Sequence, residues 1–171
     1  MLTQVTKTQV DEWLRVIGCT PVDQMDSQAA WHIEFDYPPK TPHRMHVVSP
    51  NQTPAATIIA TATQLQADHL QRFSELDQDA KEEFIWDLRH ALNRLEVDFR
   101  VDGAAGPLDC PRQFQISVTR YPDGLSLDSF ARSIGSVCKT ELDVAWLIEQ
   151  HLGGTGPARG GRFDFRKLGI D

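Results

Sequence analysis

Polar and apolar residues alternate strictly from Ala30 to Tyr37, in the stretch AWHIEFDY. Successive side chains of a strand point to opposite faces, so this period of two predicts a half-buried strand. A second strand at residues 43–49 follows the proline-rich turn PPKTP. Keeping one face apolar sets the register between the two strands. It places Met45 opposite Phe35, Val47 opposite Ile33, Arg44 opposite Asp36, and His46 opposite Glu34.

Patterns of the same kind predict the remaining helices and strands. Apolar residues at helical spacing predict a helix at residues 6–17, which Thr8 can cap, and a helical region at 66–95 that breaks near Asp77. Two more helices are predicted, one capped by Ser126 and one that begins with a capping box at Thr140 and ends near residue 152. Further strands are expected at residues 55–62, 96–103 and 113–121.

The resulting order is α-β-β-β-α-β-β-α, with short turns inside each group of strands. Short turns join antiparallel neighbours, and helices with one apolar stripe cover one face of a sheet. The sequence therefore predicts a two-layer α+β domain at residues 1–152, with a mainly antiparallel five-stranded sheet.

Two apolar features do not fit this plan. Ile58 and Ile59 are adjacent in the third strand, so they point to opposite faces, and that strand carries no charge to discourage edge pairing. Trp86 and His90 lie off the apolar stripe of their helix. A homodimer that buries the third strand or the helix carrying Trp86 would account for both features. Trp86 could equally be a second core contact.

Composition narrows the classes of function. The chain has 171 residues, 40% of them hydrophobic and 24% charged, which is typical of a soluble globular protein. Its net charge of −7 argues against nucleic acid as the main partner, because phosphate binding needs a positive surface. No apolar run approaches the roughly 18 residues that span a bilayer, and the N-terminus lacks a signal peptide's apolar core. We expect a cytoplasmic protein that does not associate with membranes.

The C-terminal residues 153–171 differ from the rest. They contain three Arg and one Lys against two Asp, a sum of +2, which leaves −9 for residues 1–152. Their glycines predict a flexible, basic tail. Contact with the acidic body or with a partner is favoured over contact with single-stranded nucleic acid. The contact residues would be basic or aromatic: Arg159, Arg162, Phe163, Phe165, Arg166 and Lys167.

No motif identifies a catalytic residue or a cofactor. The three cysteines are far apart, without a CxxC pair, and neither GxSxG, HExxH nor a complete phosphate loop occurs. His43 and His46 point to opposite faces of one strand and cannot chelate one metal. His32 and His46 share the outer face, so they form a weak candidate metal site; cross-strand pairing explains them equally well.

Four segments carry a resemblance to a known fold: WHIEF, MHVVSP, FQISVTRYPDGLSLDSF and VAWLI. Over residues 6 to about 152 the chain resembles the type III secretion chaperone-like fold, and is most similar to a small cyanobacterial family of unknown function within it. The resemblance implies small acidic homodimers that, in the secretion chaperones, hold an unfolded segment of another protein. It implies no active site. We expect a non-catalytic interaction or chaperone-like module; an enzyme with an unrecognised site is the alternative.

Overall fold

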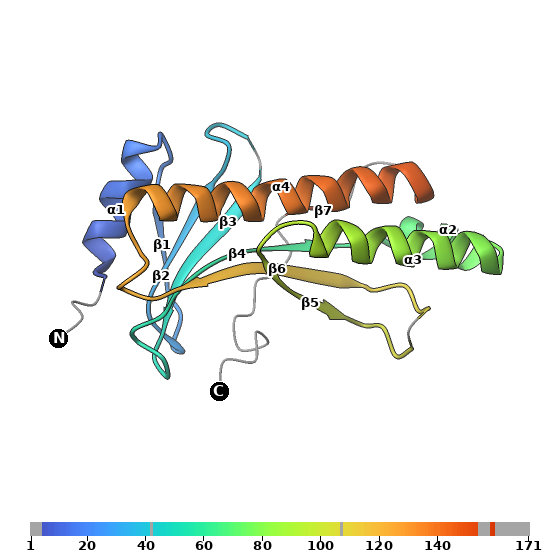
Figure 1. The fold of residues 1–171 in the computed structure, drawn as a ribbon, viewed down its shortest axis with the longest axis horizontal. Helices are drawn as coiled ribbons and strands as arrows, with labels where there is room; N and C mark the ends of the chain where they lie inside the picture. Colours follow the sequence, from blue (N-terminus) through green and yellow to red (C-terminus); the bar gives the residue numbers. More distant parts are fainter. Residues whose placement is uncertain (1–4, 42, 107, 154–157, 160–171) are drawn as a thin grey trace.

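The computed structural model describes residues 5–41, 43–106, 108–153 and 158–159. Within them one antiparallel sheet runs in the order β1-β2-β3-β4-β6-β5 (Figure 1). A seventh, very short strand, β7, pairs with β4. The strands are β1 (Val22–Gln24), β2 (Ala29–Asp36), β3 (Arg44–Pro50), β4 (Thr57–Gln64), β5 (Asp98–Asp102), β6 (Gln113–Arg120) and β7 (Ala158–Arg159).

The described helices lie on one face of this sheet (Figure 1). The longest crosses the sheet from end to end and packs on β4 and β6. The helices are α1 (Lys7–Val16), α2 (Ala67–Glu75), α3 (Gln78–Asn93) and α4 (Leu127–Leu152). The class predicted from the sequence, α+β with an antiparallel sheet, is confirmed.

The register predicted for the first hairpin is also confirmed. All four expected pairs occur between β2 and β3. One apolar row continues across the sheet through Ile33, Val47, Ile59 and Val118, and it faces the helices. We call this the helix face, and the opposite side the outer face.

Three expectations about the elements are wrong. The sheet has six strands in its main path instead of five, because β1 is too short to produce a detectable period. Thr6, and not Thr8, caps α1 by accepting a hydrogen bond from the Gln9 amide. The two C-terminal helices are one helix, in which Thr140 is buried and donates its hydroxyl to the Ser136 carbonyl instead of capping.

The break in the middle helical region is confirmed. α2 ends at Glu75, and Asp77 caps α3 by accepting a hydrogen bond from the Ala80 amide. A carboxylate at this position also stabilises the helix, because its negative charge lies at the positive end of the helix dipole. The break turns α3 alongside the second half of α4, and this placement creates the surface described below.

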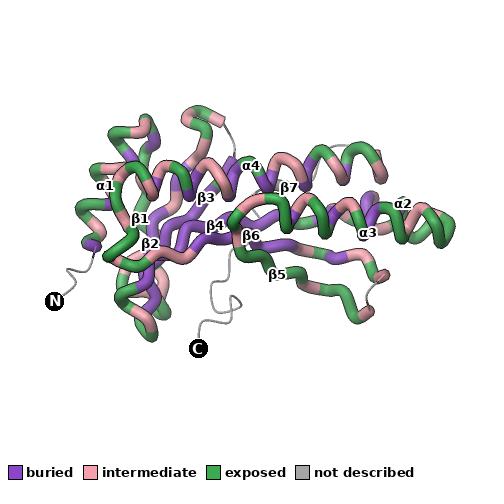
Figure 2. The backbone as a smooth tube through the Cα atoms, viewed as in Figure 1, coloured by how far each residue is buried: buried purple, intermediate pink, exposed green. Residues whose placement is uncertain are grey.

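Burial is concentrated in the central strands β3, β4 and β6, whereas β5 and the solvent side of the helices are exposed (Figure 2). The large, fully buried side chains come from both layers, among them Phe84, Phe114, Phe130 and Ile148. In the part of the chain that is described, no helix combines the length and apolar character needed to cross a membrane.

Candidate functional site

A shallow groove of about 620 Å³ lies between α3 and α4 on the solvent side of the helical layer. Of the residues singled out from the sequence, only His90 lines this groove. Nine residues line it: Asp87, His90, Ala91, Asn93, Arg94, Asp143, Trp146, Leu147 and Gln150. Both helices contribute to it because α3 packs along the C-terminal half of α4.

Two tryptophans are exposed on the helices that form this groove. Trp146 lines it and is 61% exposed, and Trp86 is 57% exposed with its ring centroid 6.1 Å from that of His90. Each is left outside because its helix buries a different stripe: Phe84, Ile85, Leu88 and Leu92 on α3, and Val144, Ala145 and Ile148 on α4. The core alternative for Trp86 is therefore wrong. Trp146 was missed, although its position off the inward stripe of its helix was the available signal.

The charges around the groove are of mixed sign. Arg94 Nη1 lies 3.5 Å from Asp143 Oδ2, and His151 Nε2 lies 2.9 Å from Asp87 Oδ2. The Arg89 guanidinium lies 5.7 Å from the centroid of the Trp86 ring, within the range of a cation–π contact. The groove therefore combines apolar rings with both charge signs, a composition found at the centres and rims of protein interfaces.

The third strand does not offer the open surface that was expected. β4 lies between β3 and β6, so it is a central strand, and both Ile58 and Ile59 are fully buried. Ile59 belongs to the core beneath the helices. Ile58 points to the outer face, as the alternation requires, and lies outside that core. A dimer interface built on these two residues is excluded by their burial within one chain.

His32 and His46 meet on the outer face. His32 Nε2 lies 3.0 Å from His46 Nδ1, and His32 Nδ1 lies 3.5 Å from Asp26 Oδ2. Burial, with the neighbouring His32 and Arg44, lowers the pKa of His46 to about 3. Burial also lowers the pKa of His32, partly offset by Asp26. Two neutral rings that share a hydrogen bond explain this geometry.

Within the described part of the chain, no third metal ligand joins the two histidines. Among the described residues, no group of three or more His, Cys, Asp or Glu side chains could hold a metal ion. The arrangement therefore gives the weak metal candidate no geometric support in this part of the chain.

A second polar cluster, missed from the sequence, is buried between α4 and the helix face. Glu141 accepts hydrogen bonds from Thr61 Oγ1 at 2.9 Å and from Thr63 Oγ1 at 2.7 Å. His43 Nε2 lies 2.6 Å from Glu141 Oε2. Neither ring nitrogen of His43 has hydrogen-bond geometry, so this contact is an ion pair without an aligned N–H.

Cys138 lies beside this pair and contacts His43. Burial alone would lower the pKa of His43, but Cys138 and Glu141 together outweigh burial and raise it to about 9. Cysteine, histidine and a carboxylate are the residue types of a nucleophilic triad. All three side chains are less than 5% exposed, however, so a substrate has no path to the sulfur. The cluster is a structural one.

The tail residues singled out earlier mostly lie outside the described residues. Only the backbone at residues 158–159 is described, as β7. The contacts expected of Arg159, Arg162, Phe163, Phe165, Arg166 and Lys167 stay predictions.

Comparisons with known proteins agree on the fold and leave the activity open. A crystal structure of an uncharacterized protein from Methanothermobacter thermautotrophicus matches at 28% identity, covering 87% of this chain and 100% of that one, with a TM-score of 0.76. A crystal structure of YbjN, a putative transcription regulator from E. coli, matches at 11% identity, covering 88% and 94%, with a TM-score of 0.50. The second likeness shows the fold alone.

Among curated proteins nothing matches. A family model described as "Uncharacterized conserved protein (DUF2299)" matches residues 6–148, which include α1 to α3, the six main strands and all of α4 except its last four residues. No function comes with that description. The chain belongs to the DUF2299 family of uncharacterized conserved proteins.

Proposed function

We propose that this protein is a non-catalytic interaction module that pairs with a second copy of itself through the groove between α3 and α4. One observation carries the proposal: Trp86 and Trp146 are both more than half exposed on the two helices that form the groove. Trp146 lines the groove, and Trp86 contacts His90, which also lines it. Tryptophan is the residue type most enriched among the residues that dominate binding energy at interfaces.

A second copy is favoured over other occupants by the charge pattern. A two-fold interface brings the same patch of each subunit together, so it must be complementary to itself. Asp87 and Asp143 supply negative charge and Arg94 positive charge within one groove. A two-fold axis through the groove would let each sign meet its opposite across the interface.

The chaperone-like part of the proposal rests on the α+β class and on the acidic charge. Class I secretion chaperones are acidic homodimers of a similar α+β plan, and this chain is acidic as well. We propose that the dimer holds an extended segment of another polypeptide. The resemblance to a cyanobacterial family adds no further support.

Light scattering coupled to size exclusion tests the dimer. The wild-type protein should elute with twice its mass of 19.3 kDa at micromolar concentration. Trp146→Ala and Trp86→Ala should shift the equilibrium toward the monomer, by about tenfold or more in Kd for each ring that is buried centrally.

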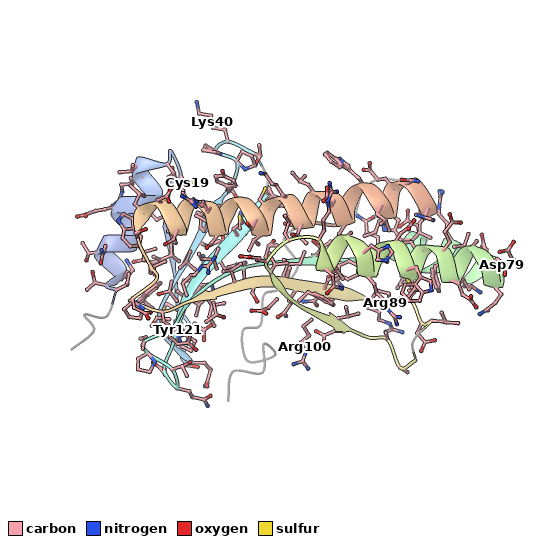
Figure 3. All side chains as sticks on the ribbon, viewed as in Figure 1. Cys19, Lys40, Asp79, Arg89, Arg100 and Tyr121 are labelled. Carbon is pink, nitrogen blue, oxygen red and sulfur yellow. The ribbon has the colours of Figure 1, made fainter. Side chains whose placement is uncertain are left out.

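Tyr121→Ala is the matched control. Tyr121 is also an exposed aromatic residue, but it lies at the opposite end of the molecule, just before α4 begins (Figure 3). This variant should remain a dimer. A wild-type mass of 19.3 kDa would refute the dimer, and a dimer unaffected by either tryptophan variant would refute the groove as its interface.

A further inference from the structure

The central part of the sheet's outer face is buried, although no described helix covers it. The four helices pack on the other side (Figure 1). Central outer-face side chains are nevertheless at most 2% exposed, and their apolar members lie outside the main core. They are Val48, Ile58, Ala60, Ala62, Gln115 and Ser117. Something other than the helical layer must shield this face from water.

Gln115 indicates which polar groups a partner on this face would need. Its side chain is fully buried, and neither its amide nitrogen nor its amide oxygen has a hydrogen-bond partner. Leaving a buried amide unpaired is costly, so native structures normally supply a donor and an acceptor. The backbone of an extended segment offers both.

β7 brings the chain to the edge of this face. Arg159 pairs with Thr63 and Ala158 with Gln64, in antiparallel register. β6 pairs with β4 along its whole length, so β7 must occupy the edge that β3 leaves open. From Ala158 to Arg159, β7 runs along β4 from Gln64 toward Ala60. Ala60 is paired with His46 of β3, so β3 occupies the same edge of β4 beyond β7.

The position beyond Arg159 along this edge of β4 is therefore already taken by β3. On the helix side, the space beside Thr61 and Thr63 is filled by Glu141, which both threonines contact. The outer side is the remaining direction. Two glycines, Gly160 and Gly161, follow in the sequence, and glycine permits the sharp turn that docking on the outer side would require.

The chemistry of residues 160–171 suits this face. The stretch RFDFRKLGI places Phe163 and Phe165 two residues apart, so both would lie on one side of an extended segment. Acidic residues outnumber basic ones on the outer face: Glu34, Asp36, Asp98 and Asp102 against Arg44 and Arg100. Arg100 projects away from the helices (Figure 3). An extended chain of this length spans about 40 Å, which is more than the length of β4.

We propose that residues 160–171 dock on the outer face of their own chain as an extended segment, with Phe163 and Phe165 over the row that contains Ile58 and Ala60. The outer face is thus a peptide-binding surface, and the C-terminal segment is its intramolecular ligand. This inference stands independently of the dimer.

Limited trypsin digestion of the full chain, followed by mass spectrometry, tests the docking. Cleavage after Arg162, Arg166 and Lys167 should be about tenfold slower in the wild type than in Phe163→Asp/Phe165→Asp, because cleavage follows the population of the undocked segment. Asp164→Ser is the matched control. Its side chain alternates with the two phenylalanines and points away from the sheet, so protection should persist.

Ser117→Arg locates the surface, since it places bulk and positive charge on the outer face. A folded Ser117→Arg protein should lose protection; one that keeps it would mean that the segment docks elsewhere. Equal cleavage of the wild type and the double-Asp variant would overturn the proposal and leave the sheet shielding itself. Protection that vanishes on dilution would overturn it too, by showing that another copy supplies the segment.

Discussion

Each face of the sheet holds a buried histidine site, and the two sites shift histidine pKa values in opposite directions. On the helix face, His43 is paired with the buried Glu141, and its pKa is raised to about 9. On the outer face, His46 lies against another histidine, and its pKa is lowered to about 3. Burial alone would lower both values.

The comparison shows that the partner, and not the depth of burial, decides whether a buried histidine is charged. A carboxylate held by two threonines carries a negative charge that stabilises an imidazolium. A second neutral imidazole carries no such charge, so the buried His46 ring stays neutral. The helix-face site therefore depends on charge, and the outer-face site on neutrality. Three measurements test this contrast.

The largest effect is expected from Glu141→Gln. This substitution leaves His43 without its counter-ion in a buried site, and breaking a buried pair typically costs about 3 kcal/mol or more of unfolding free energy. Urea unfolding near neutral pH measures the loss. Glu149→Gln, on the exposed side of the same helix, is the control and should change stability little. A loss below about 1 kcal/mol would show that the pair is not charged.

An intermediate effect is expected when the pH is raised. The pKa of His43 is about 9 in the folded protein and ordinarily 6.5, so its stabilising charge is fully present below about pH 6.5 and is lost as the pH rises toward 9. Stability should fall by about 2 kcal/mol between about pH 6.5 and 8.5. In Glu141→Gln this dependence should largely disappear. An unchanged alkaline slope in that variant would assign the loss to another group.

The smallest effect is expected on the acid side. Because the pKa of His46 is depressed, the unfolded chain binds a proton first, and stability is lost as the pH falls below about 6.5. Between about pH 7 and 5.5, above the range of most carboxylates, the loss should be about 1 kcal/mol. His46→Leu should reduce it. An NMR titration that finds His46 protonated near pH 6.5 would contradict the neutral pair directly.

Much of the fold could be predicted from local pattern. The alternation in AWHIEFDY specified a strand, and the need to keep one face apolar specified all four pairs of the first hairpin. The break before α3 followed from the acidic run at Asp77. Thr140 shows the limit of local pattern: its capping box is real in sequence, but a helix already begun at Leu127 continued through it.

Local sequence pattern specified which residues form strands and helices and which face of each is apolar, because side-chain period and capping act over a few residues. Packing of the whole chain placed β4 in the centre of the sheet, which buries Ile58 and Ile59. It also brought Thr61 to Glu141 across 80 positions of sequence, and set Trp146 beside the helix of Trp86. Such pairings depend on strand order and helix placement, which arise from packing the whole chain and leave no periodic trace along it.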